Sequence, residues 1–270
     1  MGFRVFIKRH PVLTYFILAF AISWIADFAV GWPKFSRGQP LGFSEALLMF
    51  IPTLAGPSIA GIAMTGIVDG RAGLRDLLSR MGRWRVRWHW YSALLIFPVL
   101  ILAVSLVLVA LVSSSFAPYF FATGIAVGLI GGFFEEIGWT GYAFPKMQLK
   151  QNALKAAVLL GLMHGLWHFA PDYLGASVAR GPYWLPHFAM FVVSMTAMRV
   201  LLVWVYVNTR SVLLGQLTHA SSTGFLSILV PLSLSPANDT LFYAVLAIAL
   251  WAAVALVVAK YGKHLGRQPG

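Results

Sequence analysis

Long runs of apolar residues recur along the whole chain, and short polar segments separate them. A helix rises about 1.5 Å per residue, so roughly 20 apolar residues are needed to cross the hydrocarbon core of a bilayer. Eight runs approach or exceed this length: residues 12–32, 47–68, 90–112, 116–142, 153–170, 184–207, 211–232 and 241–259. The pattern therefore predicts an all-α, polytopic membrane protein with about eight transmembrane helices.

Composition agrees with the apolar pattern. Of the 270 residues, 59% are hydrophobic and only 10% are charged, and the mean hydropathy is +0.79. Soluble domains carry about 25% charged residues and are much less apolar. We detect no internal repeat and no soluble segment, so the sequence predicts one integral membrane domain over residues 1–270, with the lipid bilayer as its partner.

The positive charge follows the predicted topology. A formal net charge of +12 would suit a nucleic-acid binder, yet nearly all of the 20 Lys and Arg residues fall in segments that share one side of the predicted bundle. Lys34, Arg37 and Arg180 are the exceptions among the loops, and Arg199 lies inside an apolar run. Cytoplasmic loops of membrane proteins are enriched in Lys and Arg. The distribution predicts both termini in the cytoplasm and argues against a nucleic-acid partner.

The longest basic segment, residues 71–90, reads RAGLRDLLSRMGRWRVRWHW. Interleaved Arg and Trp residues suit an amphipathic helix that lies on anionic lipid. We therefore expect this segment at the cytoplasmic surface of the membrane, and a partner-binding role is the alternative.

Few ionisable side chains lie inside the apolar runs. They are Asp27, Glu135, Glu136, His164, His168, Arg199 and His219. A charge at membrane depth costs several kcal/mol, so such groups usually mark a functional site. Counted from the basic ends of their helices at about 1.5 Å per residue, all but His164 and Asp27 lie roughly 14–20 Å deep. Side chains from four helices can therefore meet in one layer, whereas we expect Asp27 to be structural.

Two carboxylates and several imidazoles at one depth are the groups that acid–base or metal-assisted hydrolysis uses. His164 and His168 are four residues apart and share one helix face, a spacing also found among metal ligands. The chain has no cysteine, which excludes a thiol nucleophile and a Cys-bound metal. A structural interpretation is also open, because membrane histidines often bond a neighbouring helix and the glutamates could pair with Arg199.

Three short motifs follow one another in this region: EEIGWTGYAFP from Glu135, HGLWHFAP from His164 and HASSTG from His219. At these residues the chain resembles the CAAX-processing and bacteriocin-processing (CPBP, or Abi) intramembrane proteases, which include the prenyl-protein endopeptidases of the endoplasmic reticulum. The pattern of that family is EExxxR, aromatic-xxx-His and HxxxN on separate helices. The resemblance covers residues 131–224, which would form the core of a CAAX-protease-like bundle.

The resemblance implies roles for the matching residues. Glu135 matches the general base, His168 matches the histidine that holds the attacking water with it, and His219 matches the histidine that stabilises the oxyanion. The implied activity is an intramembrane endopeptidase that hydrolyses peptide bonds of membrane-associated peptides or proteins. The cofactor stays open: Zn²⁺ or another divalent metal would be held by the same three residues if one is bound, and glutamate-activated water alone is the alternative.

The sequence departs from the family pattern at three positions. Thr140 stands where the pattern has Arg, His164 where it has an aromatic residue, and Thr223 where it has Asn. Threonine carries no charge, so we expect Arg199, at a similar depth on another helix, to pair with Glu136 instead. His164 would add a ligand or a proton relay. The Thr223 hydroxyl can still donate to an oxyanion, with a shorter reach than an amide.

The resemblance also places the protein in a bacterial inner membrane, close to bacteriocin maturation or self-immunity. Two other functions stay open. One is a catalytically impaired family member that acts as a bacteriocin self-immunity or scaffold protein, because Thr140 and Thr223 replace motif residues. The other is a proton-coupled transporter whose Glu and His groups form a relay. We expect the protease, with a cavity that opens toward the cytoplasmic half of the membrane and has Glu135, His168 and His219 at its floor.

Overall fold

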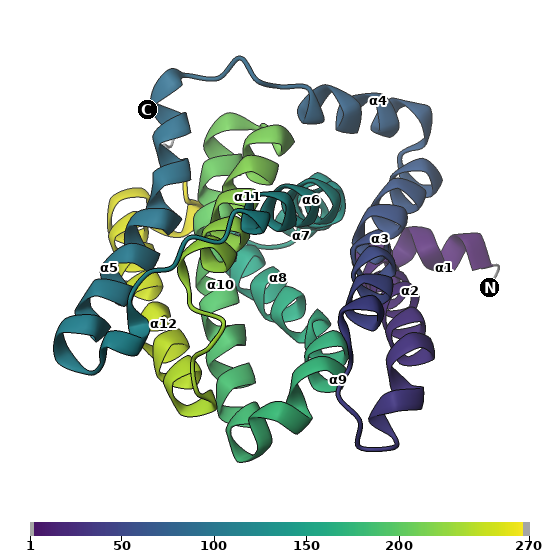
Figure 1. The fold of residues 1–270 in the computed structure, drawn as a ribbon. Coiled ribbons are helices and arrows are strands. Elements are labelled where there is room, and N and C mark those ends of the chain that lie inside the picture. The colour runs from purple at the N-terminus through teal and green to yellow at the C-terminus, as the bar shows by residue number, and fades with distance from the viewer. Residues whose placement is uncertain (1–2, 267–270) are drawn as a thin grey trace.

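The computed structural model describes residues 3–266, and this part of the chain contains helices and no strand (Figure 1). Residues 1–2 and 267–270 of the predicted single domain lie outside the described residues. The α-helices are α1 Phe3–Arg9, α2 Pro11–Phe35, α3 Phe43–Val68, α4 Gly70–Met81, α5 Ile96–Leu111, α6 Thr123–Gly138, α7 Phe144–Gln148, α8 Ala153–Trp167, α9 Phe169–Arg180, α10 Trp184–Thr209, α11 Val212–Leu229 and α12 Pro236–Tyr261. Short 3₁₀ segments are η1 Trp88–Leu95, η2 Ser114–Phe116, η4 Gly181–Tyr183 and η5 Gly262–His264, and one π-helical turn is η3 Trp139–Ala143.

Several helical segments have the length and composition of membrane spans. Five of them within residues 3–266 are long and apolar enough to cross a bilayer: Pro11–Phe35, Ser44–Val68, Trp88–Leu111, Phe169–Thr209 and Pro236–His264. The predicted all-α membrane bundle is therefore confirmed. The count of eight spans stays a prediction, because α6, α8 and α11 are only 16, 15 and 18 residues long.

α10 lies in the middle of the bundle beside α8, with α2 and α3 on one side and α5 and α12 on the other (Figure 1). All residues of α10 from Thr196 to Val203 are buried, and Arg199 lies within this stretch. α8 approaches closely at Gly161, where a Cβ would stand 2.7 Å from the Cα of Thr196 and 3.1 Å from the Cβ of Arg199. This close approach brings the Arg199 side chain next to α8.

α6 and α11 pack with their backbones in contact. Gly124, Gly128 and Gly132 repeat every four residues and so share one face of α6. A Cβ at Gly132 would stand 2.5 Å from the carbonyl oxygen of Gln216 and 2.6 Å from the backbone nitrogen of Ala220, both on α11. Small residues at this spacing let membrane helices approach closely. The helix with both glutamates is thus held against the helix with His219.

α6 does not end as a regular helix. It passes through the π-helical turn η3, whose five residues are all buried, and continues as α7. Single π turns inside helices often mark functional sites. Pro145 stands in the first turn of α7, where proline is tolerated in a helix. The hydrophobic pattern of residues 116–142 predicted a plain helix and did not indicate the π turn.

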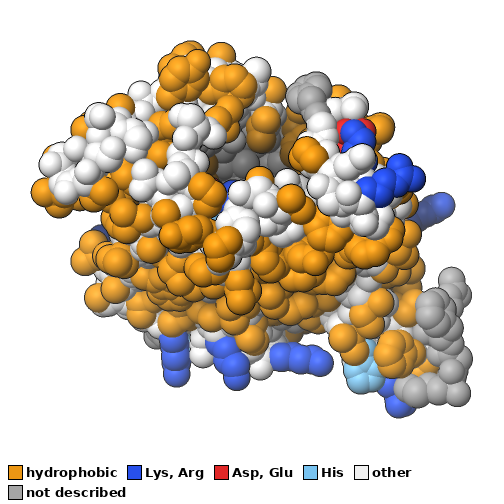
Figure 2. Space-filling model, turned by 60° about the horizontal axis from the view of Figure 1, so that its bottom comes forward, with side chains coloured by type: hydrophobic (Ala, Val, Ile, Leu, Met, Phe, Trp, Pro, Cys, Tyr) orange, Lys and Arg blue, Asp and Glu red, His pale blue; other side chains and the backbone are white. Residues whose placement is uncertain are grey.

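The basic residues gather at one end of the bundle. Figure 2 shows Lys and Arg side chains along the lower edge of the molecule, below a broad belt of hydrophobic side chains. The segment 71–90 crosses from α3 toward α5 (Figure 1). Only its first part is α-helical, because α4 ends before Gly82 and residues 83–87 have no helical structure. The expectation of an amphipathic helix was therefore right only for the first part of this segment.

Candidate active site

Glu135 and Glu136 are neighbours on α6 but face different surroundings. Successive residues of a helix point about 100° apart, so the two carboxylates diverge. Glu135 lines a cavity, whereas Glu136 is 0% exposed and points into the bundle. This separation lets one carboxylate meet a substrate while the other serves a buried network.

Glu136 forms a fully buried ion pair with Arg199 on α10. Arg199 donates from Nη1 to Oε2 over 2.7 Å and from Nη2 to Oε1 over 2.8 Å. The Thr140 hydroxyl also donates to Oε2 of Glu136, and Arg199 Nη1 lies 3.5 Å from the Thr140 oxygen. As expected, Arg199 supplies from another helix the charge that Thr140 lacks.

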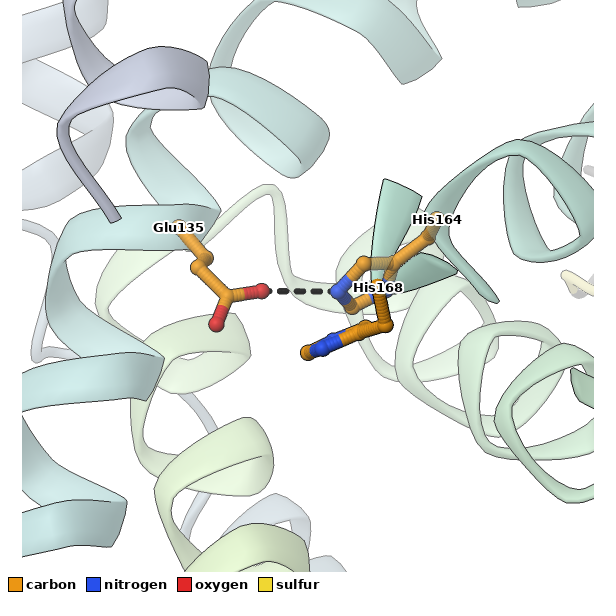
Figure 3. A group of neighbouring side chains, drawn as sticks. All are labelled: Glu135, His164 and His168. Carbon is orange, nitrogen blue, oxygen red and sulfur yellow. Dashed lines mark hydrogen bonds and ion pairs between the residues drawn. The ribbon is translucent and has the colours of Figure 1, made fainter. Parts of the chain in front are cut away.

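Arg199 also fixes the protonation of the His164 ring. Its Nη2 lies 2.8 Å from His164 Nδ1, and a guanidinium can only donate, so Nδ1 must be the acceptor. The ring proton is then on Nε2, which donates to Oε2 of Glu135 over 2.7 Å (Figure 3). Trp139 Nε1 donates to the same oxygen over 3.3 Å. Glu136, Arg199 and His164 thus form a chain that holds one oxygen of Glu135.

His219 on α11 bridges the buried network and the cavity. Its Nδ1 lies 2.7 Å from Oε1 of Glu136, a carboxylate oxygen already paired with Arg199, so Nδ1 is the donor. The other nitrogen, Nε2, lies 4.0 Å from Oε2 of Glu135. His219 lines the cavity, so Nε2 is the ring atom left for a ligand there.

His168 follows the last residue of α8 and lies one turn beyond His164. Figure 3 shows the rings of both histidines on the side of α8 that faces Glu135. The His168 ring packs against Trp167 and Phe191, with ring centroids 4.7 and 5.1 Å apart. Its Nε2 is buried and has no hydrogen-bond partner among residues 3–266. His168 therefore has a free ring nitrogen beside the cavity it lines.

The cavity has a polar floor and apolar walls. Its volume is about 460 Å³, within the range of ligand-binding cavities. Glu135, His168, His219 and Thr223 line the polar part. The apolar walls include Leu41, Met49, Phe50, Leu54, Val127, Phe191, Met195 and Leu226. The three residues predicted to carry catalysis thus meet in one cavity, together with Thr223.

The mouth of the cavity lies at the end of the bundle remote from the basic segments. Its lining comes from the beginnings of α3, α6, α10 and α12 and from the ends of α8 and α11. Apart from Lys34, Arg37 and Arg180, the Lys and Arg residues outside the apolar runs lie toward the opposite ends of these helices. Figure 2 shows a hollow in the upper part of the molecule, away from the edge with Lys and Arg. We expected an opening toward the basic half, and that expectation was wrong.

Packed side chains close the site on its basic side, which explains the correction. Trp139, Tyr142, Phe144 and Tyr206 are each at most 2% exposed and lie between the glutamates and the basic end. Arg80 of α4 covers this plug, donating over 2.9 Å to the Tyr206 hydroxyl and over 3.0 Å to the carbonyl oxygen of Gly141. Counting residues from the helix ends gave the depth of the site but not the side on which it opens.

The donor atoms allow a test of the predicted metal site. Glu135, His164 and His168 each offer an atom within 4.8 Å of the others. His164 does not fit, because Nδ1 accepts from Arg199 and Nε2 carries the proton, and a ligating nitrogen must be unprotonated. Glu135, His168 and His219, the set expected from the sequence, offer the carboxylate and imidazole donors that zinc accepts. This set stays a prediction, because the donor atoms that gather within 4.8 Å of one another in residues 3–266 include His164 and not His219.

Asp27 is a buried carboxylate that stands apart from the site, and Trp139 is a site residue that the sequence did not indicate. Asp27 accepts from the Thr53 hydroxyl over 2.5 Å and does not line the cavity, in keeping with a structural role. Trp139 was not among the expected site residues although its indole donates to Glu135. Its position four residues after Glu135 on one helix face was the available signal.

Comparison with known proteins agrees with the motifs. Residues 117–225, which include all three motifs, match the family described as type II CAAX prenyl endopeptidase Rce1-like. A curated relative, CAAX prenyl protease 2 of Methanococcus maripaludis, is 23% identical over 228 residues, covering 78% of this chain and 82% of the relative. The all-α membrane fold, the motif residues gathered at one cavity and these two matches agree on one similarity: residues 117–225 resemble the CAAX prenyl endopeptidases, and the chain as a whole is similar to an intramembrane protease of that family.

Proposed function

We propose that the protein hydrolyses peptide bonds of membrane-associated peptides or proteins with a water molecule activated by Glu135. The observation that carries the proposal is the arrangement of this carboxylate. One oxygen is held by His164 and Trp139, while the other accepts no hydrogen bond from residues 3–266. A carboxylate fixed at one oxygen and free at the other, beside the unpartnered nitrogen of His168, suits a general base.

The reaction then uses each group at the floor of the cavity. A water between Glu135 and His168 gives a proton to the free Glu135 oxygen, and the water oxygen bonds to the carbonyl carbon of the peptide. Negative charge develops on the carbonyl oxygen, where the Thr223 hydroxyl is an available donor. His219 would donate from Nε2 as an imidazolium, with its Nδ1 proton held by Glu136. Glu135 returns its proton to the amine that leaves when the C–N bond breaks.

Glu136 and Arg199 act by holding other groups in place. Glu136 accepts from Nδ1 of His219, and Arg199 accounts for the tautomer of His164. Both are fully buried, so neither meets the substrate. They are positioning residues for His219 and Glu135.

A divalent ion such as Zn²⁺ would be held by Glu135, His168 and His219, and it would acidify the bound water. The hydrogen bonds from His164 and Trp139 already orient Glu135 without an ion. We therefore expect a chelator to leave the rate unchanged. Loss of activity with EDTA and recovery with Zn²⁺ would contradict this expectation.

The two other functions have less support. The impaired-scaffold alternative depended partly on the missing arginine at Thr140, and Arg199 now pairs with Glu136 in its place. The transporter alternative needs a route past the glutamates, and buried Trp139 and Phe144 fill the basic side of the site. We further propose a bacterial inner membrane as the location, with both termini cytoplasmic, because of the one-sided Lys and Arg distribution.

The experiment is cleavage of a quenched fluorescent peptide library by the purified full-length protein in nanodiscs. Wild type is compared with Glu135→Gln and His168→Ala, each with and without chelator. We expect cleavage by wild type and loss in both variants. Cleavage that persists in Glu135→Gln would overturn the assignment of the base. Proton-coupled uptake into liposomes that depends on Glu135, without cleavage, would favour the transporter.

A further inference from the structure

A groove at the basic end of the bundle is separate from the catalytic cavity. It lies where the 3₁₀ segment η1 meets the ends of α10 and α12, and α12 lies beside both α5 and α10 (Figure 1). Its volume is about 620 Å³, within the range of ligand-binding sites, and it shares no lining residue with the catalytic cavity. The groove is therefore a second candidate binding site.

Two cations line this groove without an acidic partner. Arg87 stands directly before η1, Lys260 is in the last turn of α12, and both residues are exposed. No acidic residue lines the groove, and the chain has none in residues 77–134 or 240–270. Within residues 3–266, neither cation takes part in an ion pair. The groove thus presents positive charge that suits an anion.

Three aromatic side chains line the groove beside these cations. The Trp204 ring lies between the other two, with ring centroids 5.0 Å from Trp90 and 5.8 Å from Tyr261. Lys260 Nζ lies 5.5 Å from the centre of the Tyr261 ring. Trp204 Nε1 is buried and has no hydrogen-bond partner among residues 3–266, although a buried indole N–H usually has one. Since Trp204 lines the groove, an oxygen atom of a ligand bound there can supply the missing acceptor.

The groove lies where exposed apolar surface gives way to basic residues. Leu256 is one turn before Lys260 on the same face of α12 and is 74% exposed. Leu95 and Val99, at the end of η1 and the start of α5, are 61% and 59% exposed. Trp and Tyr gather at the headgroup level of a membrane, and Lys and Arg reach toward it. A ligand in the groove would therefore meet cations at one side and the hydrocarbon region at the other.

We propose that the groove binds the headgroup of an anionic phospholipid, with the phosphate beside Arg87 and Lys260 and the acyl chains along the exposed apolar residues of α5 and α12. Basic pockets between transmembrane helices bind acidic headgroups in this way. A soluble phosphate would meet the same two cations but would leave the apolar surface uncovered. The site shares no residue with the catalytic cavity, so lipid binding does not depend on the proposed hydrolysis.

The test is lipid binding by the purified, delipidated full-length protein in detergent, measured by native mass spectrometry. The ligands are phosphatidylglycerol, phosphatidylcholine with the same acyl chains, and glycerol phosphate, which has the phosphate without the chains. Arg87→Gln/Lys260→Gln removes both cations of the groove. Arg75→Gln/Lys150→Gln is the matched control, because it removes two exposed cations outside the groove and so lowers the net charge equally.

Two cations beside a headgroup account for about a 30-fold difference in affinity. Wild type and the control variant should therefore prefer phosphatidylglycerol over phosphatidylcholine by about that factor, and Arg87→Gln/Lys260→Gln should lose the preference. Arg87→Gln alone should lose about fivefold, so the result does not depend on the double variant folding. The same preference in both double variants would overturn the proposal. Glycerol phosphate that binds as tightly as phosphatidylglycerol would assign the groove to a soluble phosphate instead.

Thermal unfolding in detergent without lipid tests the competing role of Lys260. A cation in the last turn of a helix also interacts with the helix dipole. If Lys260 serves α12 alone, Lys260→Gln lowers the melting temperature without lipid and leaves the lipid preference as in wild type, which would contradict the proposal. We expect the opposite: a weaker preference for phosphatidylglycerol, and a smaller rise in melting temperature than in wild type when this lipid is added.

Discussion

Arg199 links the two glutamates of the site through different partners. It donates to both oxygens of Glu136, and it makes His164 a donor to Glu135. Removing one partner of a buried ion pair lowers stability by much more than the intact pair adds to it. The single arginine on α10 therefore serves both folding and the orientation of the base.

Replacing Arg199 with leucine leaves Glu136 buried without a counter-charge. We expect the free energy of unfolding to fall by about 3–5 kcal/mol, the range for breaking a buried ion pair. Thr140 lies four residues after Glu136, so an arginine there can reach the same carboxylate. The double variant Thr140→Arg/Arg199→Leu should regain part of the loss in thermal unfolding. A double variant no more stable than Arg199→Leu would show that position 140 cannot replace the α10 arginine.

His164→Phe keeps an aromatic ring beside Trp139 but removes both hydrogen bonds of the imidazole. Losing an oriented partner of a catalytic group typically costs about 10- to 100-fold in activity. We expect this loss in kcat with little change in KM, because His164 does not line the cavity. His164→Gln, whose amide can both donate and accept, should recover part of the rate. Equal kcat in His164→Phe and wild type would show that Glu135 needs no such support.

At the scale of helices, the distance between α6 and α11 sets the geometry of the site. His219 reaches Oε1 of Glu136 at 2.7 Å because the glycines of α6 allow backbone contact with α11. The π turn η3 then follows directly, with Trp139 and Thr140 both bonded to the glutamates. Small residues on one face and a widened turn on the same helix together position the catalytic groups.

Gly132→Ala tests this close approach. The added methyl group would meet the backbone of α11 at 2.5 Å, so the helices must separate. Overpacking of this kind costs about 1–3 kcal/mol, and the movement of His219 should also lower kcat. Gly175→Ala is the control, since nothing lies within 4 Å of its Cβ. There, alanine should leave stability unchanged or raise it by up to about 1 kcal/mol. Equal effects of both changes on unfolding would contradict the packing argument.

The sequence was sufficient to predict the all-α membrane fold and most of the residues that gather at the site. Apolar runs predicted the all-α bundle, and depth along the helices brought Glu135, His168 and His219 to one layer. Depth says nothing about rotation around a helix, so neither the π turn at Trp139–Ala143 nor the closed basic side could be derived. The pairing of Arg199 with Glu136 was predictable only because Thr140, which replaces the arginine of the motif, leaves the Glu136 carboxylate without a counter-charge on its own helix.

At the scale of the whole molecule, the protein is a bundle closed at its basic end and hollow at the other. The plug of aromatic residues and Arg80 separates the site from the side with most of the positive charge. The substrate path is therefore one-sided. Changes at the mouth should affect substrate binding, and changes at the closed end should not.

Gly175→Phe adds a ring beside the cavity, at a position where a Cβ would meet no atom within 4 Å. We expect a higher KM for a cleaved peptide, unchanged kcat and unchanged thermal stability, since the floor of the cavity is untouched. Gly82→Phe at the closed end is the matched control and should leave KM as in wild type. A KM that rises only in Gly82→Phe would show that the substrate enters at the basic end and not at Gly175.

The most direct test of the central claim is the single-turnover rate of peptide cleavage by Glu135→Gln, measured beside wild type. Asp27→Asn is the control, because it neutralises another buried carboxylate, which accepts from the Thr53 hydroxyl and does not itself line the cavity. A general base contributes about 10²- to 10⁴-fold, so Glu135→Gln should lose that much while Asp27→Asn retains most of the wild-type rate. Equal rates for Glu135→Gln and wild type would show that this carboxylate does not activate the attacking water.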